Sequence, residues 1–195
     1  MEEEKIAANI AVRAALDSIT EIMGENGSKI IFKKAGLLHI MENPPEYDWD
    51  PCIPITQQGK IYFEIANLLG LKGALSVWRR IGYTNIKYAV EIGHALNNLP
   101  DLEPNEKFSQ VMENLRIAIG MGKLAAKEDG TVDFDVFDCN ICEGYTFDRP
   151  ICTAITGSVQ YIADWSYGHN VKTAKEIKCR AKGDDSCYFI IEDRD

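Results

Sequence analysis

The period of the hydrophobic residues changes at Asp129-Gly130, a pair of residues typical of a turn. Before this turn, as in the segment 104–119, apolar residues recur every three or four positions, which is typical of amphipathic helices. After it, the segment 131–138 alternates apolar and acidic residues, which predicts a half-buried strand. We therefore expect an α+β fold, in which a mainly helical part, 1–128, packs as a layer on a small, largely antiparallel sheet within 129–195.

Glycine and proline mark the expected ends of the helices. Gly24 and Gly82 are expected to end helices, and Pro104 to begin one. Four prolines among the twelve residues of the segment 43–54 predict an irregular loop. These signals predict helices over 5–23, 28–36, 56–69, 73–81 and 84–98, and another from 104 onward.

A further helix and a hairpin are expected after the first strand. Arg149-Pro150 is expected to open a helix that runs to about Tyr167. Two strands, 171–180 and 187–192, flank a polar turn that contains Gly183, which is typical of a hairpin. In the first strand, the alternation predicts that Val132, Phe134 and Val136 face the helices while Asp133 and Asp135 face water.

Five of the six cysteines lie between positions 139 and 187. They are Cys139, Cys142, Cys152, Cys179 and Cys187, and Cys52 stands apart. Because zinc takes four tetrahedral ligands, one of the five is expected not to bind it, and Asp138 or Glu143 could replace a thiolate. An all-thiolate set closes the coordination sphere, so the expected zinc is structural. Buried free thiols and a Cys179–Cys187 disulfide are the alternatives.

Charge and motif content disfavour several classes of function. The net charge is −9, from 30 acidic against 21 basic residues, which disfavours binding to nucleic acid. There is no apolar run long enough to span a membrane, and the acidic start MEEEK is unlike a secretory signal, so we expect a cytoplasmic protein. The sequence also lacks GxGxxG, P-loop, HExxH and GxSxG motifs, and no catalytic residues or intrinsic turnover are expected.

The hairpin resembles the C-terminal signature of the 4-vinyl-reductase domain. The matching residues run from Glu176 through Cys179, Gly183 and Cys187 to Phe189, and Pro150-Ile-Cys152 and Gly157 also fit. The resemblance implies one such domain over 1–195, with a fold shared with transport-particle (TRAPP) subunits and with the sensor domains of phenol-responsive transcription activators. It also implies binding of a small hydrophobic molecule.

In the phenol sensors of this family, three cysteines and one glutamate hold a structural zinc. Cys152, Cys179 and Cys187 match the three cysteines. The glutamate position is expected upstream, near the end of the first strand, where this chain has Cys139 and Cys142 instead.

Together these features predict a stand-alone binding module for a hydrocarbon, an aromatic or a tetrapyrrole-like molecule, with a structural zinc. The alternatives are a reductase acting on a vinyl group of a tetrapyrrole, and an interaction subunit that forms a homodimer. The aromatic residues expected to line an apolar pocket are Trp78, Tyr83, Tyr88, Tyr161 and Trp165. His94 lies in a segment expected to be helical, where a packed or surface role is favoured over a haem ligand.

Overall fold

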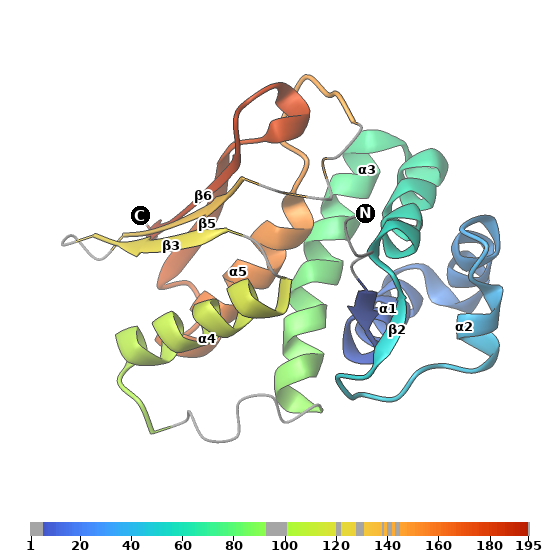
Figure 1. Cartoon of the computed structure of the whole chain (residues 1–195), viewed down its shortest axis with the longest axis horizontal. Coiled ribbons are helices and arrows are strands. Elements are labelled where there is room, and N and C mark those ends of the chain that lie inside the picture. The colour runs from blue at the N-terminus through green and yellow to red at the C-terminus, as the bar shows by residue number, and fades with distance from the viewer. Residues whose placement is uncertain are drawn as a thin grey trace. The chain divides into compact units, whose positions relative to one another are not determined.

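The chain folds into two compact units, Met1–Ala95 and Leu96–Asp195 (Figure 1). The computed structural model describes residues 6–92, 101–119, 122–127, 131–137, 139, 142 and 145–194. Helices dominate the first unit, and the second combines helices with an antiparallel sheet. The expected α+β fold class is therefore confirmed.

Two long helices form the first unit. Helix α1 (Asn9–Lys34) packs against α3 (Ile55–Glu91), and the short helix α2 (Leu38–Glu42) follows α1. Strand β1 (Ile6–Ala8) pairs with the antiparallel strand β2 (Pro51–Pro54). Fully buried side chains of these helices include Val12, Ile19, Phe32, Ile61 and Ile65. Burial of these apolar faces stabilises the helix pair more than intrinsic helix propensity does.

Glycines interrupt both long helices, but not at every expected place. Gly24 has φ 71° and Gly70 has φ 68°, and each marks a kink after which the helix resumes. Gly82 was expected to end a helix, and that prediction is wrong, because Gly82 is a buried residue inside α3. A single glycine is tolerated where packing on both sides supports the helix. The expected helix 84–98 is described only as far as residue 92.

The segment 43–54, expected to be an irregular loop, ends in strand β2. Proline cannot donate to a strand ladder, but it is tolerated in a short edge strand. The preceding turn is held by backbone bonds, since the N–H groups of Asn9 and Ile10 donate to the carbonyl oxygens of Asp50 and Asp48 at 2.8 and 2.9 Å. Short strands of this kind are defined by their partner and carry little sequence signal of their own.

The second unit is a four-stranded sheet with helices on one side. The strand order is β3 (Lys123–Ala126), β4 (Val132–Val136), β6 (Cys187–Asp193) and β5 (Lys172–Lys178), all antiparallel. Helix α5 (Thr153–Tyr167) packs on β5, and α4 (Pro104–Ile119) packs on α5. Strand β4, helix α5 and the hairpin of β5 and β6 were predicted from the sequence, and β3 was not.

Side chains of β4 that are fully buried alternate with side chains that are not, which identifies the inner face of the strand. Phe134 and Val136 are fully buried, and Phe134 lies opposite Phe189 of β6 with ring centroids 6.0 Å apart. Asp133 and Asp135 were expected to face water, but both are half-buried. The Lys127 ammonium lies 2.9 Å from Asp133 Oδ1 across the β3–β4 pair and compensates part of that burial.

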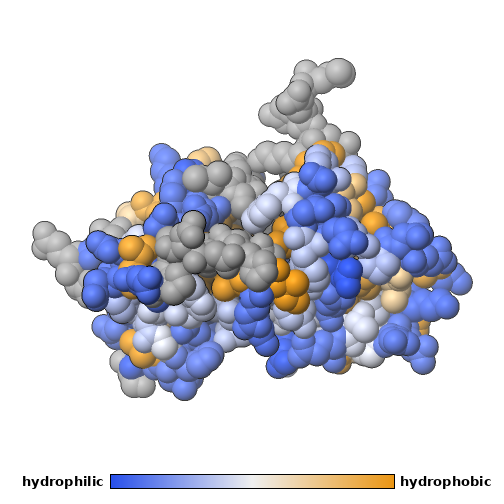
Figure 2. All heavy atoms as spheres, turned by 90° about the horizontal axis from the view of Figure 1, so that it is seen from below, coloured by the Kyte–Doolittle hydropathy of each residue, from blue (hydrophilic) through white to orange (hydrophobic). Residues whose placement is uncertain are grey.

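Hydrophilic residues cover most of the coloured surface in the view of Figure 2, and hydrophobic residues gather there in smaller groups. This distribution agrees with a sequence in which 26% of residues are charged. Among the helices described, none is both long and apolar enough to cross a membrane.

The kink at Gly70 generates a prediction about backbone conformation. A Cβ at Gly70 would meet no neighbouring atom, but its φ of 68° disfavours any residue with a side chain. We expect Gly70→Ala to lower the free energy of unfolding by about 1–2 kcal/mol. The matched control is Gly59→Ala in the same helix, where φ is ordinary and space is open. It should raise stability by about 0.5–1 kcal/mol. Equal effects in urea denaturation would contradict a kink at Gly70.

The inner face of the sheet generates a second prediction. Phe134→Ala should lower the free energy of unfolding by about 3–5 kcal/mol, because it opens a cavity beside Phe189. Phe137 lies just beyond the same strand, but it is 49% exposed. Phe137→Ala should therefore cost less than about 1 kcal/mol. Circular dichroism during urea denaturation measures both, and a larger loss for Phe137→Ala would reverse the assigned faces of the strand.

Candidate metal centre

The five clustered cysteines come from four segments of the second unit. Cys139 and Cys142 follow β4, Cys152 is the residue before α5, Cys179 follows β5, and Cys187 begins β6. Each of the five residues is at most 4% exposed. The structure thus gathers all the predicted metal ligands in one buried place, although they span almost fifty positions of sequence.

The turn of the hairpin positions Cys179 and Cys187. The N–H of Cys179 donates to Asp184 Oδ2 at 2.8 Å, and its carbonyl oxygen accepts from the N–H of Lys182 at 2.9 Å. Residues 179–184 form a tight turn, called the knuckle below. Gly183 closes it with φ 100°, a conformation that favours glycine. The N–H of Arg180 then points at Cys187 Sγ, 3.4 Å away. Donation of this kind stabilises a thiolate.

The same knuckle holds the segment that carries Cys139. The Arg180 guanidinium donates to the carbonyl oxygen of Cys139 at 3.2 Å. The N–H of Phe147 also donates to the carbonyl oxygen of Ala181 at 2.7 Å. Two of the cysteine-bearing segments are thereby joined by polar contacts of the protein itself.

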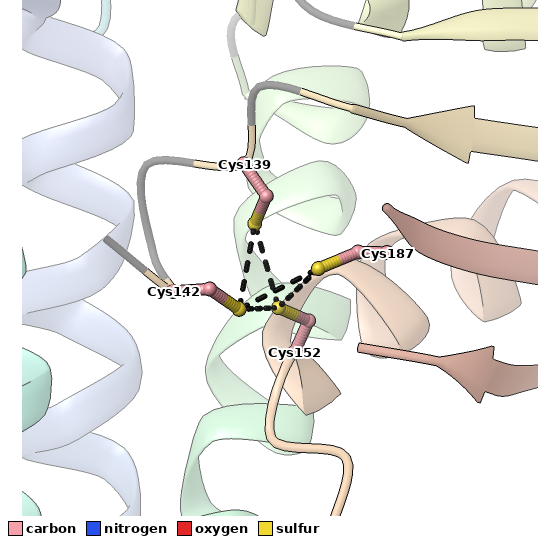
Figure 3. A group of neighbouring side chains, drawn as sticks. All are labelled: Cys139, Cys142, Cys152 and Cys187. Carbon is pink, nitrogen blue, oxygen red and sulfur yellow. Dashed lines mark hydrogen bonds between the residues drawn. The ribbon is translucent and has the colours of Figure 1, made fainter. Parts of the chain in front are cut away.

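Four sulfur atoms converge as a metal site requires. Figure 3 shows the side chains of Cys139, Cys142, Cys152 and Cys187 pointing toward one another. The Sγ–Sγ distances are 3.8 Å for Cys139–Cys142, 3.4 Å for Cys139–Cys152, 2.9 Å for Cys142–Cys152, 3.5 Å for Cys142–Cys187 and 3.6 Å for Cys152–Cys187. Four buried cysteines therefore lie close enough together to hold a metal ion.

Zinc fits this donor set. Sulfurs placed tetrahedrally about 2.3 Å from zinc are separated by about 3.8 Å. Most of the observed separations lie within a few tenths of an ångström of that value. Only the Cys142–Cys152 pair, at 2.9 Å, has to open by nearly 1 Å. Soft thiolate donors in this number favour zinc over magnesium or calcium.

A second group of donors overlaps the first. Cys152, Glu176, Cys179 and Cys187 each offer one atom within 4.8 Å of the others. Cys179 is also in contact with the first group, since its Sγ lies 3.5 Å from Cys142 Sγ. Both carboxylate oxygens of Glu176 are buried and, among the described residues, have no hydrogen-bond partner of normal geometry.

A bulge in β5 explains how Glu176 reaches the sulfurs. Glu176 pairs with the buried Phe189, and Lys178 pairs with Tyr188, so Ile177 is an extra residue in the ladder. Residues three apart normally face opposite sides of a strand. The bulge reverses this relation, and Glu176 and Cys179 both face inward.

A glutamate lies beside the cysteines at a place where no metal ligand was expected. The fourth donor of the family pattern was expected upstream, near the end of β4, and the structure also places Glu176 of β5 beside Cys152, Cys179 and Cys187. The available signal was the acid three residues before Cys179, which periodicity assigns to the opposite face of the strand. Asp138 and Glu143, the other candidate carboxylates, lie outside the described residues.

The electrostatics of the cysteine cluster follow from burial and mutual contact. Burial, reinforced by the negative charge of Cys179, raises the pKa of Glu176 to about 10. Hydrogen bonding with the Cys142 and Cys152 side chains lowers the pKa of Cys179 to about 6 and holds the pKa of Cys139 far below its usual value. Several acidic groups thus share few protons, an arrangement that a divalent cation neutralises.

The aromatic residues expected to line a ligand pocket are divided between the two units. Trp78, Tyr83 and Tyr88 belong to α3, and Tyr161 and Trp165 to α5. Trp78 is buried against Tyr62, and the Tyr88 hydroxyl donates to Glu21 at 3.2 Å. Trp165 faces α4, where the Lys107 ammonium lies 5.0 Å from its ring centre.

His94, considered as a haem ligand, falls outside the described residues. A hollow of about 550 Å³ lies beside Cys142, lined by Tyr145, Thr146, Arg180, Gly183, Asp184 and Asp185. Its lining is mainly polar and charged, unlike the apolar pocket expected from the sequence. We therefore interpret it as an approach to the cysteine cluster.

The segment that carries this centre matches a known family. Residues 132–193 match the model of the 4-vinyl-reductase domain. The resemblance to that domain is confirmed for this segment, which contains β4, α5 and the hairpin. The protein MJ0745 of Methanocaldococcus jannaschii is 33% identical over 72 residues, which are 37% of this chain. The match spans 39% of that curated relative, about two fifths of its length.

Solved structures share the fold at low sequence identity. An H-NOX protein from S. oneidensis, in the Fe(II)NO ligation state, has a TM-score of 0.62 and 12% identity, over 96% of this chain and 99% of that one. Another H-NOX structure, from a study of heme distortion, has a TM-score of 0.60 and 14% identity, over 96% and 95% of the two chains. The phenol-responsive sensory domain of the transcription activator PoxR, solved with phenol, has a TM-score of 0.57 and 12% identity, over 75% and 77%.

The centre generates a prediction about stability. Cys187→Ser should reduce the bound zinc and lower the free energy of unfolding by more than about 2 kcal/mol, because a structural metal joins segments far apart in sequence. Cys52→Ser, at the cysteine of β2, is the matched control and should change neither. Elemental analysis and thermal denaturation measure the two effects. Loss of metal with an unchanged Tm would contradict a structural role.

Proposed function

We propose that this chain is a binding module for a small hydrophobic molecule, with a structural zinc centre in its 4-vinyl-reductase segment. The observation that carries the zinc proposal is the convergence of buried thiol sulfurs from four segments. Donor convergence and soft ligand character together favour a bound metal.

The zinc is structural in this proposal. Its ligands come from the segment after β4, the start of α5 and both arms of the hairpin. A thiolate-rich, closed coordination sphere has no open position for water, and its negative charge weakens zinc as a Lewis acid. The ion would hold the hairpin to the helix and add its binding free energy to folding.

Ligand binding is supported by the fold and by the composition of the helices. Similar folds include a sensory domain solved with phenol and proteins studied for heme distortion. Those ligands are planar and largely apolar, as are the hydrocarbon, aromatic and tetrapyrrole-like molecules proposed here. Within the second unit, Tyr161 and Trp165 of α5 are candidate pocket residues. A homodimer is proposed as the assembly.

Native mass spectrometry of protein purified without chelator tests this proposal. We expect a mass that includes zinc, a co-purified apolar molecule lost on solvent extraction, and a dimer. Elemental analysis checks the metal independently, and chelator-treated protein is the control. Well-folded protein without metal would contradict the zinc centre. Failure to bind phenol, hemin or any co-purified molecule would contradict the binding module.

A further inference from the structure

The two groups of candidate donors share two residues. One group contains Cys139, Cys142, Cys152 and Cys187, and the other contains Cys152, Glu176, Cys179 and Cys187. Cys152 and Cys187 belong to both, and their sulfurs lie 3.6 Å apart. Two tetrahedral metal ions that share an edge have this composition: two ligands bridge both ions, and each ion has two terminal ligands of its own.

We propose that the centre holds two zinc ions bridged by the sulfurs of Cys152 and Cys187. Cys139 and Cys142 complete the coordination of one ion, and Glu176 and Cys179 that of the other. This proposal rests on the metal centre of the proposed function and extends it from one ion to two. Thiolate sulfur can bridge two zinc ions, as it does in Zn₂Cys₆ modules.

The number of donors favours two ions over one. One tetrahedral zinc uses four donors and leaves two of the six without a metal. With the one ion in the four-cysteine group, Glu176 has no metal. Among the described residues, its carboxylate oxygens also have no hydrogen bond of normal geometry that could take the place of a metal. A buried acid in that position is costly. Two ions that share two sulfurs need six donors, and the site offers six.

Charge leads to the same conclusion. When all six donors are deprotonated, the five thiolates and one carboxylate carry six negative charges, of which a single divalent ion offsets only two. Two ions leave two, which the Arg180 guanidinium at the Cys139 carbonyl and the N–H of Arg180 at Cys187 Sγ partly offset. Burial of uncompensated charge is strongly unfavourable, so the second ion stabilises the fully deprotonated cluster.

The sheet order places the donors as this arrangement requires. Strand β6 lies between β4 and β5, and it begins with the bridging residue Cys187. Cys139 and Cys142 follow β4 on one side, while Glu176 and Cys179 come from β5 on the other. Cys152, at the start of α5, supplies the second bridge. The Cys142 and Cys179 sulfurs, 3.5 Å apart, bind different ions and separate when both are present.

The metal content of the intact protein tests the proposal. Native mass spectrometry and elemental analysis should give two zinc ions per chain. One zinc per chain would overturn the binuclear centre and leave the structural zinc of the proposed function standing. No zinc in folded protein would overturn both. Iron with acid-labile sulfide would show that the six donors hold an iron–sulfur cluster, which also overturns the proposal.

Paired variants locate each ion. Cys139→Ser/Cys142→Ser and Glu176→Gln/Cys179→Ser should each retain one zinc, and Cys52→Ser should retain two. Retention of two ions by either double variant would contradict the assigned ligands. Since a variant can fail to fold, the intact protein is also loaded with ¹¹³Cd. Two cadmium resonances coupled to each other through the bridging sulfurs are expected, and two uncoupled resonances or a single one would rule out the bridge.

Discussion

The second unit depends on bringing five buried thiols and the buried carboxylate oxygens of Glu176 into one cluster. Five thiols and the Glu176 carboxyl repel one another once deprotonated, and each loses its hydration on burial. The backbone bonds of the knuckle after β5, the bulge in β5 and the start of α5 all serve this convergence. A cation of matching softness would turn that repulsion into attraction, and its binding free energy would then add to the stability of the local fold.

The sequence predicts those parts of this unit that follow a simple period. Alternation identifies β4, the turn around Gly183 identifies the hairpin, and the clustering of cysteines identifies the candidate ligands. The inward direction of Glu176 is not predicted, because it depends on the bulge at Ile177, which no periodic pattern encodes. Strands β1, β2 and β3 are not predicted either, because their pairing and not their composition defines them. The helix end predicted at Gly82 is wrong because packing of α3 overrides the low helix propensity of glycine.

The fold alone does not decide the ligand. H-NOX proteins and the PoxR sensory domain share it at 12–14% identity, and they were studied with different small molecules. At such identity the shared elements are the helices and the sheet, whose apolar spacing many sequences satisfy. The cysteine cluster, in contrast, lies within the segment that matches the 4-vinyl-reductase domain. It is therefore the feature of this chain that links a specific set of residues to a specific chemistry.

The hollow beside Cys142 gives the centre an orientation with respect to solvent. Cys142 borders the hollow, whereas Cys187 and Cys152 are fully buried and are not among its lining residues. Exchange of an ion would therefore begin at Cys142, and its rate would depend on how large and how charged the incoming chelator is. Asp184 and Asp185 at the rim repel anionic chelators and attract free cations. An ion at this site would therefore be removed more slowly by an anionic chelator than by a neutral chelator of the same size.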